Sequence, residues 1–230
     1  MTYLLMRLLG RLPIGWLQLT YNKARLTAAI AGVAFANLLV FAQLGILGSL
    51  NNSIVSSYEL FDADILISSS DANTLLEGAN VPRQYLYSAL AVPGVRSAAP
   101  IFLDSRSWIR KNGDTINFQL VGLDPEAASF VNSAKVPSLL SLRRRDTAFM
   151  DIKTRGLETL DLSGLTTINP FRFELYNRTL SIIDTFTVGG GFAADGYLVV
   201  SDQTFFGFFP RRASSAPDHI MVKLVQGASM

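Results

Sequence analysis

An uncharged stretch at residues 26–50 constrains this chain more than any other feature, because it holds no Asp, Glu, Lys or Arg. A helix of about 25 residues, rising roughly 1.5 Å per residue, reaches about 37 Å and can cross a hydrocarbon core of about 30 Å. A cleaved signal peptide is the alternative, but its apolar region is shorter and no A-x-A-like site follows Leu50. We predict an uncleaved transmembrane helix over residues 26–50.

Charged residues are distributed unequally on the two sides of this helix. By the positive-inside rule, the N-terminus is predicted to be cytoplasmic and the main domain to lie on the far side of the membrane. Residues 1–25, rich in leucine and arginine, are expected to form an amphipathic segment on the cytoplasmic surface. Basic residues before the helix are Arg7, Arg11, Lys23 and Arg25, whereas the first charges after it are Glu59, Asp62 and Asp64.

Small residues recur within the predicted span at a spacing of four. Ala28, Gly32 and Ala36 therefore line one face, where the backbone of another helix could approach closely. Asn37 and Gln43 are amides in the same run and favour hydrogen-bonding partners over lipid. We predict helix packing through Ala28, Gly32, Ala36 and Asn37; the alternative is a lone anchor that tolerates these residues.

Composition excludes several kinds of function for the roughly 180 residues that follow the helix. The formal net charge of +2 and the scattered basic residues give no electrostatic case for nucleic acid. The absence of cysteine excludes disulfides and thiolate chemistry. The single histidine, His219, borders a predicted strand and is expected to pack or lie on the surface. We predict no catalytic residue, no cofactor site and no metal site.

The remaining pattern predicts an α+β fold. A strand at 63–68, a helix from Pro82 to Leu90 and an extended stretch at 95–103 suggest a right-handed crossover if the two strands are parallel. From Asp104 onward the pattern becomes β-rich and mainly antiparallel, with a short helix within 136–145. The Asn112-Gly113 pair between strands 108–110 and 115–121 indicates a type I′ hairpin. Further strands are predicted at 171–175, 179–188, 197–201 and 220–225, with a turn at 177–178.

The glycine-rich run at 189–191 resembles a dinucleotide fingerprint only superficially. That fingerprint must open a helix, whereas Asp195-Gly196 and a predicted strand follow here. We therefore interpret these glycines as a turned or flexible loop.

Several short motifs occur in a characteristic order along the chain, at 13–20, 23–26, 32–36, 64–68, 86–95, 121–125, 192–196, 201–203 and 209–210. Together they resemble one family, the permease subunit of the cyanobacterial heterocyst-type exporter called DevC, within the MacB-like class of ABC transporters. The resemblance extends from about residue 10 to the C-terminus and depends on the ordered set rather than on any single motif.

The resemblance implies an inner-membrane permease whose first helix precedes a periplasmic core domain. That domain would have an α/β base at 51–103, a β-rich lobe at 104–210 and a return to the base at 211–230. Three further membrane helices would follow, so the sequence is expected to be an N-terminal, C-terminally truncated part of such a protein.

The same resemblance implies a separate ATPase subunit, a periplasmic adaptor, a TolC-like outer-membrane channel and a homodimer at full length. The implied cargo is glycolipid or another amphiphile. The alternatives are a single-span anchored extracytoplasmic binding or structural domain, or a non-functional fragment; an enzyme is the third and weakest hypothesis.

Overall fold

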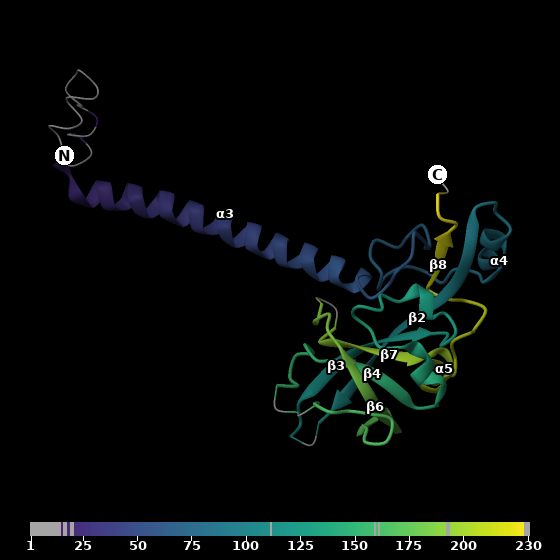
Figure 1. The fold of residues 1–230 in the computed structure, drawn as a ribbon. Helices are drawn as coiled ribbons and strands as arrows, with labels where there is room; N and C mark the ends of the chain where they lie inside the picture. Colours follow the sequence, from purple (N-terminus) through teal and green to yellow (C-terminus); the bar gives the residue numbers. More distant parts are fainter. Residues whose placement is uncertain are drawn as a thin grey trace. The chain divides into compact units, whose positions relative to one another are not determined.

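The computed structural model describes residues 15, 18, 21–110, 112–158, 160, 162–191 and 194–227. The chain forms two compact units, Met1–Ser49 and Leu50–Met230, and their elements are drawn in Figure 1. The amphipathic segment predicted at 1–25 lies outside the described residues except for 15, 18 and 21–25.

Helix α3 (Lys23–Tyr58) contains the predicted transmembrane segment and is longer than it at both ends. Asn22 caps its start, since Asn22 Oδ1 accepts a hydrogen bond from the Arg25 N–H at 3.2 Å. Among the described residues, α3 is the one helix long and apolar enough to cross a membrane. Beyond the predicted membrane span, the helix continues through residues 51–58.

The unit Leu50–Met230 is built on one eight-stranded sheet with the order β1-β8-β2-β3-β7-β4-β6-β5. Its strands are β1 (Ile65–Ile67), β2 (Val95–Ile109), β3 (Thr115–Leu123), β4 (Thr147–Asp151), β5 (Phe171–Leu175), β6 (Arg178–Phe186), β7 (Gly196–Ser201) and β8 (His219–Leu224). The helical elements are α4 (Gln84–Leu90), η1 (Ala128–Phe130), η2 (Leu139–Arg143) and α5 (Asp202–Phe208). The strands predicted at 63–68, 171–175 and 197–201 and the helix at 82–90 are thereby confirmed, with small shifts at their ends.

Strand β2 belongs to two parts of the sheet. Its first part, from Val95 to Ile101, pairs with β8, and its second part, from Phe102 to Ile109, pairs with β3. Strands β1 and β2 are both antiparallel to β8, so they run parallel to each other with β8 between them. The predicted division between residues 103 and 104 falls inside this continuous strand.

Two hydrophobic cores cover the two faces of the β-rich region, and consecutive residues of one strand enter different cores. In β7, Leu198 and Val200 pack with the phenylalanines of α5, whereas Tyr197 and Val199 pack with η1 and η2. Figure 1 shows α5 beside this sheet. Gly122 of β3 permits the close approach of α5, because a Cβ there would lie 2.7 Å from Phe205. All six residues of β7 are therefore buried.

The prediction of a mainly antiparallel β region is confirmed, although the sheet is mixed. Strands β3 and β7 pair in parallel, as do β4 and β6, while β4 and β7 are antiparallel. Strand β4 and helix α5 were not predicted. Every residue of β4 is buried, so it lacks the apolar and polar alternation of a half-exposed strand. Ser201 caps α5, its Oγ accepting the Thr204 N–H at 3.2 Å, and this Ser-x-x-Thr signal was available in the sequence.

The type I′ turn lies in a different hairpin from the one predicted. The hairpin between β2 and β3 exists, but its last pair is Ile109↔Thr115 and the loop comprises residues 110–114. Between β5 and β6, by contrast, Leu175 pairs with Arg178 across a loop of Tyr176 and Asn177. Both loop residues have positive φ, 49° and 60°, as a type I′ turn requires. The short helix predicted within 136–145 is present as the 3-10 helix η2.

Candidate functional site

The small-residue face of α3 is exposed along its whole length. Ala28, Gly32 and Ala36 are all exposed, and no described atom lies within 4 Å of a Cβ built on Gly32. Phe41, about 180° around the helix from Gly32, is one of the exposed apolar side chains on the opposite side. A second helix could therefore approach α3 at these positions without displacing any described side chain.

The two amides of α3 occupy different faces. At roughly 100° per residue, Asn37 is turned about 100° from Ala36 and lies off the line of small residues. Gln43 follows Ala36 by seven residues, or close to two turns, and therefore lies on the same face as Gly32 and Ala36. The predicted set Ala28, Gly32, Ala36 and Asn37 thus contains one residue off the common face. Gln43 is the amide that shares the face, and its seven-residue spacing was the signal for it.

The last turns of α3 are part of the folded unit Leu50–Met230. Ser57 is buried, and its Oγ lies 2.6 Å from the hydroxyl of Tyr197, a fully buried residue of β7. The Ser57 hydroxyl also lies 3.4 Å from the Ser53 carbonyl oxygen, to which it donates. Because an unpartnered buried hydroxyl is costly, this pair fixes the end of α3 against the central region of the sheet.

The segment after α3 is held by backbone and side-chain bonds on both sides. Leu60 is 1 % exposed, and its carbonyl accepts the Asn132 N–H at 3.0 Å. Phe61 forms an isolated antiparallel bridge with Val131. Glu59 makes an ion pair with Lys135. These contacts attach the chain leaving α3 to the η1 segment, which covers one face of the sheet.

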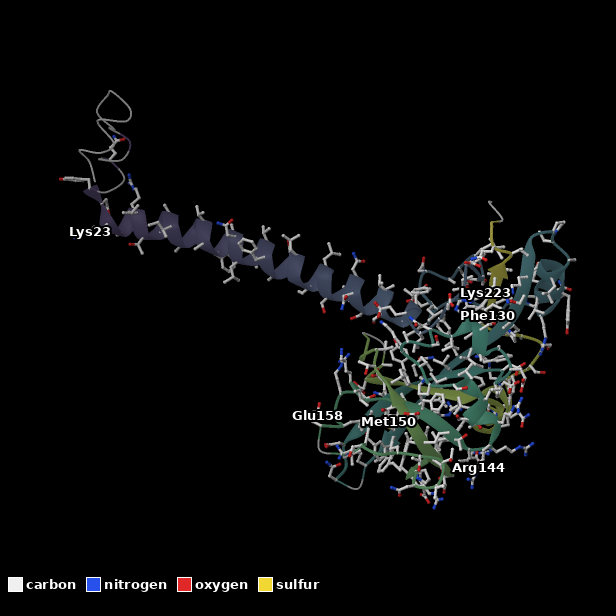
Figure 2. All side chains as sticks on the ribbon, viewed as in Figure 1. Lys23, Phe130, Arg144, Met150, Glu158 and Lys223 are labelled. Atoms are coloured by element: carbon white, nitrogen blue, oxygen red, sulfur yellow. The ribbon has the colours of Figure 1, made fainter. Side chains whose placement is uncertain are left out.

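Two acidic residues extend this attachment to β8. Asp62 pairs with Lys223 at 2.8 Å, and the Asp64 carboxylate accepts the Leu224 N–H at 2.7 Å. Figure 2 labels Lys223 on β8 and Phe130 at η1, the two places where this segment is held. We call the contacts of residues 53–64 with η1, β7 and β8 the helix junction.

A mainly apolar cavity of about 210 Å³ lies beside the helix junction. Its walls include Leu50, Ile54, Leu75 and Tyr197. Burial raises the pKa of Tyr197 above its ordinary value of 10.0, the Asp151 carboxylate adds to this rise, and the hydrogen bond to Ser57 acts in the opposite direction. Tyr197 is therefore a neutral hydrogen-bonding group at physiological pH.

The glycine-rich segment is structural. The buried Asp151 carboxylate accepts the Val188 N–H at 3.2 Å and the Gly189 N–H at 2.6 Å. Gly189 has a φ of 103°, which suits glycine. The segment leads into strand β7 and not into a helix, so the fingerprint geometry for a dinucleotide is not formed at 189–191; residues 192 and 193 lie outside the described residues.

His219 has a packing role, as predicted. It is 2 % exposed, with Nδ1 lying 2.8 Å from Ser68 Oγ and Nε2 lying 2.8 Å from the Leu75 carbonyl oxygen. Both ring nitrogens are thus used in joining β8 to the segment after β1. These two contacts account for the burial of the polar His219 side chain.

No protein-family profile and no curated protein sequence matches this chain. Solved structures with a similar backbone include the extracellular domain of the noncanonic ABC-type transporter YknZ from Gram-positive bacteria. That match has 12% sequence identity and a TM-score of 0.46, and covers 73% of this chain and 84% of the other. A second is the periplasmic region of MacB from Actinobacillus actinomycetemcomitans, with 11% identity and a TM-score of 0.46, covering 71% of this chain and 75% of the other. In this chain, a mixed sheet and short helices follow one apolar helix in the sequence.

Proposed function

We propose that this chain acts in the permease subunit of an ABC-type exporter of the MacB-like and DevC-like kind. The observation that carries the proposal is the helix junction, where an apolar helix long enough to span a membrane ends inside the core of a folded domain. The ordered sequence motifs point the same way. A simple anchor needs only a flexible linker after its span, whereas here the Ser57 hydroxyl is buried against β7.

The proposed role of the helix junction is to pass movement of the membrane helix to the extracytoplasmic domain. ATP hydrolysis would reside in a separate ATPase subunit, so the chain itself would need neither a catalytic residue nor a cofactor. The β-rich lobe would contact a periplasmic adaptor leading to a TolC-like outer-membrane channel. The proposed cargo is glycolipid or another amphiphile, as in heterocyst-type exporters of cyanobacteria.

We further propose that the N-terminus is cytoplasmic and the sheet domain periplasmic, with α3 in the inner membrane. The basic residues Lys23 and Arg25 before the span and the acidic Glu59 and Asp62 after it support this orientation. Ala28, Gly32 and Ala36 would face another membrane helix of the permease, or of a second permease copy in a homodimer. Within the domain, we propose an α/β base at 51–103 and 211–230 and a β-rich lobe at 104–210, joined through β2.

Deleting the gene in its source cell and measuring amphiphiles in the outer-membrane fraction tests this proposal. We expect glycolipid to accumulate inside the cell, and the wild-type gene to restore its export. Gly32→Leu should restore export poorly because it adds bulk on the packing face. Ala34→Leu adds bulk about 200° around the helix from Gly32 and should restore export. Unchanged export in the deletion strain would favour an anchored domain that acts alone.

A further inference from the structure

A second cavity lies next to the apolar cavity of the helix junction. It has a volume of about 240 Å³, and its walls include Gln119, Asp104 and Arg212. The segment 75–77 lines both cavities. Gln119 of β3, which lines the second cavity, is paired with Tyr197 of β7, which lines the first. Paired residues on neighbouring strands lie about 4.8 Å apart on one face of the sheet, so the two cavities are neighbours. We call them the polar cavity and the apolar cavity.

The side-chain amide of Gln119 is buried without a partner. Gln119 is 6 % exposed, and no described residue makes a hydrogen bond to its amide. It lies on the face of β3 that carries Val121 and Leu123. Buried polar groups nearly always have a hydrogen-bonding partner, and an amide offers both donors and an acceptor. A ligand that both donates and accepts hydrogen bonds would therefore satisfy Gln119.

The charges of the polar cavity oppose an anion. The Arg212 guanidinium lies 2.6 Å from Asp218 and 3.6 Å from Asp104, so it is already paired. The Asp218 carboxylate also accepts the Leu103 N–H at 2.7 Å. Glu77 adds another carboxylate to the lining. Because the carboxylates outnumber the guanidinium, an uncharged group with hydroxyls fits this cavity better than a phosphate does.

The apolar cavity suits an alkyl chain. Its volume of about 210 Å³ exceeds the roughly 150 Å³ of an apolar cavity that binds benzene, and in proportion it holds about eight carbon atoms. Leu50, the last residue of the uncharged run, and Ile54, one turn later in α3, both line it. None of the described residues of α3 lines the polar cavity. The apolar cavity is thus the one beside the membrane span.

We propose that the two cavities together bind one amphiphile. Its alkyl chain would lie against Leu50 and Ile54, and its uncharged, hydroxyl-bearing head group would bind Gln119. This order suits a lipid that leaves the membrane, because the chain stays on the side of α3. The inference rests on the proposed function, since it gives the exported amphiphile a site on this chain, but binding is measured separately from export.

The probe is an octyl glucoside with a photoreactive diazirine at the end of its alkyl chain. The full-length chain in lipid nanodiscs is irradiated with the probe, and mass spectrometry locates the adducts. We expect an adduct at Leu75, which is 2 % exposed and lies outside the span, and we expect unmodified octyl glucoside to suppress it. Octyl phosphate should suppress it about tenfold less effectively, because the surplus carboxylates repel it. Adducts confined to residues 26–50 would overturn the proposal, since a probe dissolved in the bilayer gives the same result.

Two variants test the two cavities. Ile54→Trp fills the apolar cavity from α3 and should lower the Leu75 adduct several-fold. The matched control is Val55→Trp, because Val55 is the next residue, is 58 % exposed and does not line the cavity; it should leave the adduct unchanged. Gln119→Leu removes the unpartnered amide and should weaken suppression by octyl glucoside about threefold to tenfold. Thermal unfolding of Gln119→Leu should match wild type, because no described partner is lost.

Equal Leu75 adducts in Ile54→Trp and Val55→Trp would overturn the site of the alkyl chain. Unchanged suppression by octyl glucoside in Gln119→Leu, or stronger suppression of the wild type by octyltrimethylammonium, would overturn the uncharged head group. An export defect in the deletion strain without a Leu75 adduct would contradict this inference alone. An adduct together with normal export would contradict the proposed function alone.

Discussion

The hydroxyl groups of Ser57 and Tyr197 lie 2.6 Å apart and join the last turn of α3 to the buried strand β7. The two residues are 140 positions apart in the sequence. Both side chains are almost completely buried. This bond is the part of the helix junction most directly open to test by mutation.

Replacing Tyr197 by Phe keeps the ring and removes this hydrogen bond. We expect the free energy of unfolding to fall by about 1 to 2 kcal/mol, because the Ser57 hydroxyl keeps only its longer bond to the Ser53 carbonyl. Denaturant unfolding of the full chain in detergent measures the change. Tyr176→Phe is the matched control, since Tyr176 is 68 % exposed, and its effect should stay within about 0.5 kcal/mol.

Stability should also depend on this tyrosine at alkaline pH. Burial raises the pKa of Tyr197 in the folded chain above its ordinary value of 10.0. The folded state therefore holds this proton more tightly than the unfolded state, and the resulting stability is lost as pH rises from about 10 through the raised pKa. Unfolding measured at several pH values should show the advantage of wild type over Tyr197→Phe shrinking above about pH 10. A constant or growing advantage would contradict this assignment.

Gly122→Ala should destabilise the contact between β3 and α5. The added methyl would lie 2.7 Å from Phe205, and overpacking of this kind costs about 1 to 3 kcal/mol. Thermal unfolding followed by circular dichroism measures the loss. Adding Phe205→Leu should recover part of it, because the smaller side chain makes room for the methyl group. If the double variant loses more stability than the two single variants lose together, this collision is not the cause.

The orientation of α3 can be tested with reporter fusions. A reporter that is active only outside the cytoplasm should work when fused after Ser70 and fail when fused after Tyr21, because the basic residues precede the span. A cytoplasm-dependent reporter at the same two positions should give the reverse pattern. Activity of the first reporter at Tyr21 would place the N-terminus outside the cytoplasm and would contradict the proposed function.

Cross-linking tests the packing face of α3 directly. A photoreactive residue at Gln43, which lies on the face of Gly32 and Ala36, should cross-link to another membrane helix when the chain is in its native membrane. Gly32→Leu should lower the yield several-fold, whereas Ala34→Leu on the other side of the helix should not. Equal yields in both variants would mean that the helix is an anchor surrounded by lipid.

The sequence by itself determined those features that depend on neighbouring residues along the chain. The absence of charge over residues 26–50 predicts a membrane helix independently of the fold of the following domain, because transfer into lipid depends on the polarity of each side chain in the segment. Alternation of Phe171, Phe173 and Leu175 with charged residues likewise predicted β5, an edge strand with one buried face. Helix α4 was predicted from Pro82 and the apolar residues that follow it.

Only the tertiary structure decided which segments pair. Strand β4 lies between β7 and β6 and is buried on both faces. Its sequence therefore lacks the alternation of apolar and polar residues by which a half-exposed strand is predicted. The parallel pairs β3–β7 and β4–β6 join strands that are distant in the sequence, and no local pattern encodes their relative direction. The end of α3 at Tyr58 was decided in the same way. The helix continues through residues 51–58, where Ser57 has its hydrogen-bonding partner on β7, 140 positions away in the sequence.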